Sequence, residues 1–325
     1  MRKIEEYIDL ANKAVNEIQY PAQPSGLYEP IVYGLSQGGK RLRPAILLAA
    51  CEAVGGRAED ALSQAAAIEM FHNFTLLHDD VMDHASLRRG KPTVCCKWNN
   101  NVAILSGDTM LTMASQLLTK GVEPEKAVQL LDAFNQTAIG VYEGQQYDME
   151  FETRADVTIE EYIEMIRLKT SVLLAGACRI GAILGNADKA TADALYDFTI
   201  NLGLAFQLQD DRFDVYGDPK VFGKNIGGDI MNNKKTYLLI SALNMAKGAD
   251  LEELQYWLRE PAPLAGEKIA AVTAIYDRLN INEVCQKQID RYNNQALEAL
   301  KRSNLSAEAM AFFESFDTMV MGRNK

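Results

Sequence analysis

The segment Leu76-Leu77-His78-Asp79-Asp80-Val81-Met82-Asp83 ends a long run of alanine and apolar residues and turns abruptly acidic. The run 58–83 is apolar around almost its whole circumference, which is typical of a helix inside a bundle. A second segment, Leu208-Gln209-Asp210-Asp211-Arg212-Phe213-Asp214, repeats the D-D-x-x-D spacing at the end of another apolar run. We call these the first and second acidic motifs. Both are predicted to end buried helices.

Carboxylates four residues apart lie on one face of a helix, so Asp79 with Asp83, and Asp210 with Asp214, point the same way. Like charges so placed repel, and acidic groups at a helix C-terminus also meet the negative end of the helix dipole. A single copy of the D-D-x-x-D motif is explained equally well as a solvated acidic helix end. Two copies that break the same rules indicate function, and oxygen ligands of this kind suit Mg²⁺. The pair of motifs therefore predicts two faces of one magnesium site.

The composition favours helix throughout. The 325 residues are 48% apolar and 24% charged, with only nine prolines, and Ala, Leu, Met, Glu, Lys and Gln recur. Length alone would suggest two domains, but the loops between helical patterns are mostly short, which favours one domain over 1–325. Helical patterns cover 2–19, 40–54 (starting at Pro44), 58–83, 101–119, 124–147, 158–184, 189–215, 236–246, 250–258, 264–278, 280–301 and 305–320. We expect an all-α fold, a large antiparallel helical bundle.

Charge and cysteine usage exclude several classes of protein. Lys and Arg number 33 against 44 Asp and Glu, so the net charge of −11 has the wrong sign for gripping nucleic acid or anionic lipid. Five cysteines without C-x-x-C spacing fit a reducing, cytoplasmic setting. The sequence shows neither a signal peptide nor an apolar run of ~18 residues, so no stable membrane insertion is expected.

Cations nevertheless gather beside glycines, as phosphate-binding segments require. The segment 38–44 holds Lys40, Arg41 and Arg43, and 86–92 holds Arg88, Arg89 and Lys91 directly after the first acidic motif. The long loop 216–235 supplies further cations, and a loop of this length is usually functional, here as a lid. One such charge run is usually a solvated surface. Several, interleaved with carboxylates, predict diphosphates bridged by Mg²⁺. The cations of the loop are Lys220, Lys224, Lys234 and Lys235, and Lys169-Thr170 lies in a predicted helix.

In motif order the chain resembles the trans-isoprenyl diphosphate synthases, the polyprenyl synthetase family, of the short-chain geranylgeranyl or farnesyl type. The resemblance covers about residues 30–240. It rests on GGKRLRP (38–44), His72, LLHDDVMD (76–83), LRRGKPT (87–93), GD (107–108), LKTS (168–171), FQLQDD (206–211), and GKNIGGDI followed by KKT (223–236). The loop from Lys224 to Asp229 is one residue longer than in some members, which leaves the role of Lys224 less defined.

The resemblance implies an isoprenoid synthase fold around a central cavity, with the acidic motifs facing each other across its mouth. It also implies a homodimer that joins isopentenyl diphosphate to an allylic diphosphate. Asp79, Asp83 and Asp210 would bind Mg²⁺, supported by Asp80, Asp211 and Asp214. Lys40, Arg43, His72 and Arg89 would hold isopentenyl diphosphate. Arg88, Lys169, Lys224 and Lys234 would hold the allylic diphosphate, with Thr170 and Gln207 near the developing cation.

Product length would depend on the helix that carries the first acidic motif. Phe74 precedes Asp79 by five residues, about 7.5 Å along a helix axis. In the family a large aromatic side chain here forms a floor that limits the product to C15 or C20. The small Thr75 beside it, and the absence of an insertion between Asp79 and Asp83, favour C20 over C15.

Three alternatives are compatible with parts of the sequence. Glu69-Met70-Phe71-His72 has the Glu-x-x-His spacing of di-iron bundles, but no second copy exists. A terpene cyclase would share the fold yet usually replaces the second acidic motif with an Asn/Ser/Glu motif. A non-catalytic partner subunit of a prenyl synthase would be expected to lose motif residues, which are all present here.

Overall fold

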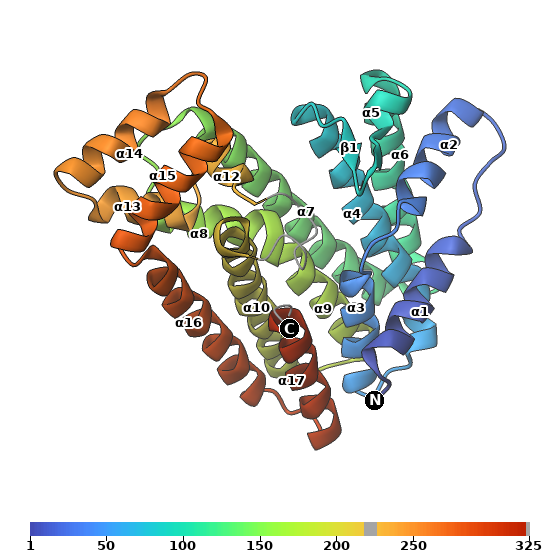
Figure 1. Cartoon of the computed structure of the whole chain (residues 1–325). Coiled ribbons are helices and arrows are strands. Elements are labelled where there is room, and N and C mark those ends of the chain that lie inside the picture. Colours follow the sequence, from blue (N-terminus) through green and yellow to red (C-terminus); the bar gives the residue numbers. More distant parts are fainter. Residues whose placement is uncertain (218–225, 323–325) are drawn as a thin grey trace. The chain divides into compact units, whose positions relative to one another are not determined.

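A computed structural model describes residues 1–217 and 226–322 of the chain. It confirms the all-α class, since the described part is helical apart from one two-stranded hairpin (Figure 1). The π-helical turn Arg167–Ser171 joins α8 to α9, a 3₁₀ turn Ala58–Ala61 precedes α4, and β1 (Leu87–Arg88) pairs antiparallel with β2 (Lys91–Pro92). The helices are α1 Ile4–Asn16, α2 Ser25–Ser36, α3 Leu42–Ala53, α4 Leu62–Met82, α5 Val94–Lys97, α6 Asn100–Thr119, α7 Pro124–Thr153, α8 Ile159–Ile166, α9 Val172–Leu184, α10 Lys189–Tyr216, α12 Gly228–Met231, α13 Tyr237–Met245, α14 Ala249–Arg259, α15 Ala265–Arg278, α16 Ile281–Lys301 and α17 Ala307–Met321.

The chain packs as two compact units. The first unit comprises Met1–Gln136, Leu173–Tyr196 and Ser303–Phe312, and the second comprises Thr137–Val172, Asp197–Arg302 and Phe313–Lys325. The first acidic motif belongs to the first unit and the second motif to the second unit. A single domain over the whole chain stays a prediction.

Helix α4 is the centre of the first unit. It packs along α6, and α1 and α3 pack against it, as the neighbouring blue and teal helices of Figure 1 show. The approach of α6 requires glycine, because a Cβ at Gly107 would collide with the His78 ring. Phe71 of α4 lies edge-on to Phe134, with ring centroids 5.1 Å apart. Apolar side chains thus enclose α4 until its last turn, where the first acidic motif begins.

The second unit encloses its own apolar core among α8, α10, α13, α15 and α16. Helices α13, α14 and α15 lie together in Figure 1, in orange. The π-helical turn Arg167–Ser171 is held closely, since a Cβ at Gly144 of α7 or at Gly203 of α10 would collide with it. Such turns occur frequently at functional sites, and this one contains Lys169 and Thr170.

Three details differ from the sequence-based prediction. Helix α2 was missed, because Gly26, Pro30 and Gly34 weaken its helical pattern. The predicted helix 158–184 is interrupted by the π-helical turn, which a regular 3.6-residue period cannot reveal. Helix α3 begins at Leu42, so Pro44 occupies the third helical position and the predicted first position is wrong. The predicted lid falls partly on 218–225, so Lys220 and Lys224 lie outside the described residues.

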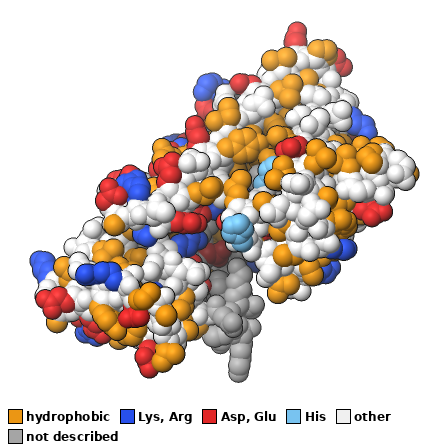
Figure 2. Space-filling view, turned by 90° about the horizontal axis from the view of Figure 1, so that it is seen from above, with side chains coloured by type: hydrophobic (Ala, Val, Ile, Leu, Met, Phe, Trp, Pro, Cys, Tyr) orange, Lys and Arg blue, Asp and Glu red, His pale blue; other side chains and the backbone are white. Residues whose placement is uncertain are grey.

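Acidic and basic side chains are intermixed on the face of the protein seen in Figure 2. Within the described ranges, no helix combines the length and the apolar character needed to cross a bilayer. The cytoplasmic location remains a prediction.

Candidate active site

The first acidic motif occupies the last turn of α4 and has one buried and two accessible carboxylates. Asp80 is only 3% exposed, whereas Asp79 is half-buried and Asp83 is exposed. Arg88 donates to Asp80 Oδ1 from Nε at 2.8 Å and from Nη2 at 2.7 Å. The hairpin β1–β2 returns the chain to the helix end and so brings Arg88 to Asp80. The motif therefore leaves Asp79 and Asp83 as its accessible oxygen donors.

The tip of the hairpin brings the two basic segments of the first unit together. Arg89 and Gly90 form its two-residue turn with φ of 52° and 75°, the left-handed conformation such turns require. The Arg89 guanidinium lies against Gly39, where an added Cβ would be 3.1 Å from both Nη atoms. Gly39 thus permits Arg89 to approach the segment that carries Lys40, which is exposed.

Arg43 and His72 form the inner part of this basic cluster. Arg43 Nη1 lies 3.2 Å from His72 Nε2. Burial, followed by the positive charges of Arg43 and Arg89, lowers the pKa of His72 well below its usual value. A neutral imidazole accepts the Arg43 hydrogen bond at Nε2. Arg43 Nε is a buried donor without a protein acceptor in the described ranges. An anion with several oxygens would satisfy it.

Arg41, the third cation of the segment 38–44, is directed into the protein instead. Its side chain is 6% exposed, is ion-paired with Glu69, and donates to Asn12 Oδ1 at 3.1 Å and to the Leu35 carbonyl at 2.9 Å. Glu69 also accepts a hydrogen bond from Asn73. This environment commits Glu69 to the core and argues against the di-iron interpretation. Arg41 thus anchors the segment to the core, whereas Lys40 is exposed and Arg43 contacts His72.

The second acidic motif repeats the pattern with different partners. Asp211 is 4% exposed, accepts Tyr162 Oη–H at Oδ2, and accepts Gln207 Nε2–H at Oδ1 at 3.1 Å. Thr170 in turn donates to Gln207 Oε1 at 3.2 Å. Burial raises the pKa of Asp211 to about 7, although Lys234 and the two donors lower it. The structure thus links Thr170, Gln207 and Asp211 as one chain of hydrogen bonds, with Asp210 half-buried beside it.

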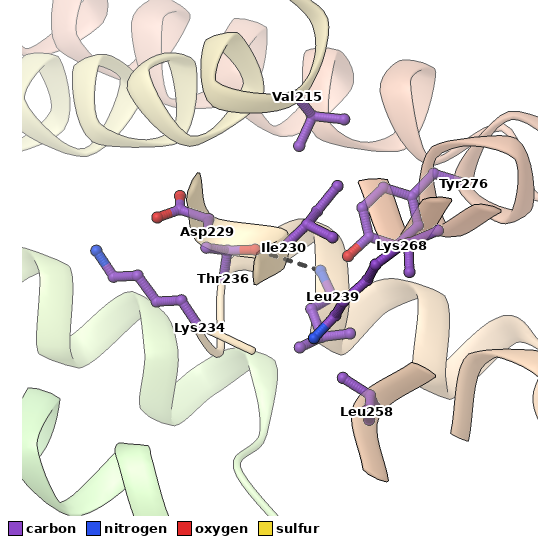
Figure 3. A pocket seen from close by; sticks show the side chains of 10 residues that line it. Val215, Asp229, Ile230, Lys234, Thr236, Leu239, Leu258, Lys268 and Tyr276 are labelled. Carbon is purple, nitrogen blue, oxygen red and sulfur yellow. Dashed lines mark hydrogen bonds between the residues drawn. The ribbon is translucent and has the colours of Figure 1, made fainter. Parts of the chain in front are cut away.

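Asp214 organises the segment that follows the described end of α10. Its Oδ2 accepts the Asp229 amide at 2.9 Å, and its carbonyl accepts the Gly227 amide at 2.5 Å. Lys234 is close to Asp229 in Figure 3. Desolvation by itself lowers the pKa of Lys234. The negative charges of Asp229, Asp211, Asp148 and Asp214 outweigh this and raise the pKa above its usual value, so Lys234 stays a cation. Four carboxylates thus stabilise the charge of one ammonium group.

Three functional candidates of the second unit were not predicted: Tyr162, Asp148 and Asp229. Asp148 of α7 forms an ion pair with Lys169. Asp229 lies inside the motif GKNIGGDI, which could have revealed it. Tyr162 and Asp148 carry no motif signal, because their partners are 49 and 21 residues away.

Phe74, the predicted floor, is 6% exposed on α4. Its ring lies 5.6 Å from that of Phe71 and 4.7 Å, edge-on, from that of His78. Thr75 Oγ1 donates to the His72 carbonyl at 2.8 Å. Phe74 is therefore held in an aromatic row along α4, and its role as a floor stays a prediction.

The structure brings together most predicted site residues within each unit. It does not test the predicted facing of the two acidic motifs, nor the role of Lys224. Among residues 1–217 and 226–322, no group of three or more His, Cys, Asp and Glu side chains could hold a metal ion by itself.

Comparison with known proteins identifies the family. Residues 24–277 match the polyprenyl synthetase family. The chain is 43% identical over 240 residues to a geranylgeranyl diphosphate synthase of Methanosarcina mazei, with 74% of each chain covered. It is 36% identical over 317 residues to a short chain isoprenyl diphosphate synthase of Methanothermobacter thermautotrophicus, with 96% of each covered.

Solved structures agree. A crystal structure of a geranylgeranyl pyrophosphate synthase superposes with a TM-score of 0.93 at 40% identity and covers 100% of both chains. The geranylgeranyl pyrophosphate synthase of Corynebacterium glutamicum, solved with isoprenyl diphosphate and magnesium, gives 0.83 at 26% identity and covers 98% of both. The fold is thus the isoprenoid synthase fold, and the relatives are synthases, as the motifs predicted. The chain belongs to the polyprenyl synthetase family and is a prenyltransferase of the short-chain isoprenyl diphosphate synthase type.

Proposed function

We propose that the protein condenses isopentenyl diphosphate with an allylic diphosphate and releases diphosphate, with a trans C20 prenyl diphosphate as its product. The observation that carries this proposal is the repeated motif geometry. In each acidic motif the second aspartate is buried and held by protein donors, while the first stays accessible. Beside both motifs lie cations suited to diphosphate.

The donor set fits Mg²⁺. Asp79, Asp83 and Asp210 offer hard carboxylate oxygens, and diphosphate and water would supply the remaining ligands of the metal. When bound there with diphosphate, Mg²⁺ would neutralise the negative charge that develops on the leaving group. Asp80, Asp211 and Asp214 support these positions through the hydrogen bonds described above.

The basic cluster of the first unit suits isopentenyl diphosphate. Arg43 offers its unpartnered Nε–H, Arg89 its guanidinium and Lys40 its exposed ammonium group to the phosphate oxygens. His72, neutral before substrate binds, contributes a ring N–H donor. These groups orient the double bond of the substrate and need not react.

Arg88, Lys169 and Lys234, with Lys224 by resemblance, would hold the allylic diphosphate. Its C–O bond breaks and the electron pair leaves with diphosphate, which gives an allylic cation. The double bond of isopentenyl diphosphate attacks this cation, a C–C bond forms, and a proton passes to a diphosphate oxygen. Thr170 and Gln207 carry hydroxyl and amide dipoles that stabilise positive charge. No covalent protein nucleophile is needed.

Product length is tested with isopentenyl diphosphate and each of the C5, C10 and C15 allylic starters, with products separated by length. We expect C20 as the longest main product. Phe74→Ala removes the proposed floor, so longer products should appear, while Thr75→Ser should leave the distribution at C20. A wild-type product of C15 would place the floor nearer the metal. An unchanged distribution for Phe74→Ala would remove Phe74 from the account.

We also propose that the protein is a homodimer. Helix α6 exposes Leu105 to 60% and Ile104 to 42%, and Val128 of α7 is 67% exposed. Large apolar side chains exposed on a helix surface are typical of subunit contacts. Light scattering coupled to size exclusion should give twice the mass of 36.0 kDa. A monomer that is fully active would contradict this part of the proposal.

A further inference from the structure

Lys268 of α15 is a buried lysine whose hydrogen-bond partners are an amide oxygen and a carbonyl oxygen. Its side chain is 1% exposed, and no carboxylate of the described ranges forms an ion pair with it. Nζ donates to Asn233 Oδ1 at 2.6 Å and to the Met231 carbonyl at 3.4 Å. Burial lowers the pKa of Lys268. An ammonium group held in this way contributes little to stability, because its desolvation is costly.

An apolar residue would fill the same place at lower cost. Lys268 lines a small cavity whose wall is apolar at Val215, Ile230, Leu239 and Leu258, and Asp229 and Lys234 line the same cavity (Figure 3). The cavity has about 10 Å³ of free space, at most one water molecule, so it is no substrate pocket. A methionine of similar length would pack against these side chains. A lysine kept here despite the cost of its burial suggests a demand beyond packing, namely the turn to which it donates.

The partners of Lys268 form the turn that precedes Lys234. Asn233 adopts a left-handed conformation with φ of 51°, and its Nδ2 donates to the Leu258 carbonyl at 3.1 Å. Lys268 Nζ donates to the oxygen of the same Asn233 side-chain amide and to the Met231 carbonyl, the last of α12. The Asn233 side chain is therefore fixed from both sides, which maintains its strained backbone.

This turn connects the two groups that face the second acidic motif. The Lys234 amide donates to the Asp229 carbonyl at 3.0 Å, so the turn places the backbones of these two residues in direct contact. Figure 3 shows the Lys234 and Lys268 side chains pointing to different sides, Lys234 on the side of Asp229. Lys268 thus acts at a distance from the ligands, through the backbone of 229–234.

We propose that Lys268 is a positioning residue that fixes Lys234 and Asp229 for binding of the allylic diphosphate. The proposal rests on the function proposed above and adds a residue outside every motif of the sequence. Lys268 itself touches no substrate. Its loss leaves the fold intact and selectively weakens the diphosphate site of the second unit, because a small displacement of a binding group has a large effect on affinity.

The test compares Lys268→Met, Lys268→Arg and, as a control, Lys301→Met at an exposed position of α16. Steady-state KM is measured for both substrates. Calorimetry with Mg²⁺ and inorganic diphosphate measures binding without turnover. For Lys268→Met we expect about a tenfold weaker affinity for diphosphate and a similar rise of KM for the allylic substrate. KM for isopentenyl diphosphate should change less than twofold, and the urea midpoint should stay or rise. Lys268→Arg should restore most of the affinity, and the control should match wild type.

Several outcomes would overturn the proposal. Unchanged diphosphate affinity in Lys268→Met, or an equal rise of both KM values, would reduce Lys268 to a packing residue. A large fall in the urea midpoint would assign it to stability. If Lys268→Met does not fold, Lys268→Gln keeps a donor of shorter reach and must show the same selective loss. Wild-type protein that binds diphosphate but condenses no substrates would refute the proposed function, while the calorimetry would still decide the role of Lys268.

Discussion

The two acidic motifs have the same spacing but are anchored by different chemistry. In both, the second aspartate is buried and the first is accessible. Asp80 is held by the Arg88 guanidinium through two short hydrogen bonds. Asp211 is held by the neutral donors Tyr162 and Gln207. One motif thus balances its buried charge with a hydrogen-bonded cation, and the other with neutral hydrogen-bond donors assisted by the positive charge of Lys234.

The difference has an electrostatic consequence. At the second motif the charge of Lys234 is stabilised by four carboxylates, and Lys169 is paired with Asp148. Because the donors that hold Asp211 are neutral, Lys234 and Lys169 are the cations that offset the carboxylates near the second motif. At the first motif, Arg88 anchors Asp80 and is also proposed to bind the allylic diphosphate. The two motifs should therefore respond differently to substitution and to pH.

The largest effect is expected from the accessible aspartates. Asp79→Asn and Asp210→Asn each remove a carboxylate proposed to bind Mg²⁺, so kcat/KM should fall by about 10²- to 10³-fold with little change in stability. Steady-state kinetics and urea unfolding measure both quantities, with Asp9→Asn at an exposed position of α1 as the control. Near wild-type kcat/KM in either variant would remove that residue from the metal site.

Removing the anchor of each buried aspartate should lower the free energy of unfolding by different amounts. Arg88→Met leaves Asp80 buried without its cation and should lower the free energy of unfolding by about 3 kcal/mol. This is the lower end of the usual range, because the Arg88 side chain is 27% exposed. Tyr162→Phe removes one hydrogen bond and should cost about 1 kcal/mol. Equal losses in urea unfolding of the two variants would show that the anchors are equivalent after all.

The last prediction concerns the pH dependence of stability. Burial raises the pKa of Asp211 from the ordinary value of 3.8, which applies to the unfolded chain, to about 7 in the folded protein. Between these values the folded protein binds more protons than the unfolded chain, so Asp211 lowers stability as pH rises from 4 to 7. Its contribution has a slope of at most about 1.4 kcal/mol per pH unit. In metal-free protein, Asp211→Asn should gain stability relative to wild type over this range. A difference that is constant with pH would contradict the burial argument.

Local pattern predicted much of this architecture, because α4 and α10 are long, apolar and end in charged turns. The motif residues Arg43, His72 and Gln207 were predicted as site residues, and the structure brings each to a motif partner. What the sequence could not reveal depends on distant contacts. The inward direction of Arg41 depends on partners from three helices.

The same reason applies to elements and anchors that were missed. The π-helical turn at Lys169 depends on close packing against Gly144 and Gly203, which lie on other helices. Tyr162 looks like any apolar-face tyrosine until α10 places Asp211 beside it. Periodicity describes one helix at a time, whereas these features arise from pairs of helices.

The most direct test of the central claim measures incorporation of labelled isopentenyl diphosphate into a prenyl diphosphate, with a C15 allylic starter. Wild type and Asp79→Asn are compared with Mg²⁺ and with chelator. The account predicts a C20 product from wild type with Mg²⁺, none with chelator, and recovery when Mg²⁺ is restored. Asp79→Asn should form about 10²-fold less. Folded wild-type protein that forms no product with Mg²⁺, or that is equally active with chelator, would contradict it.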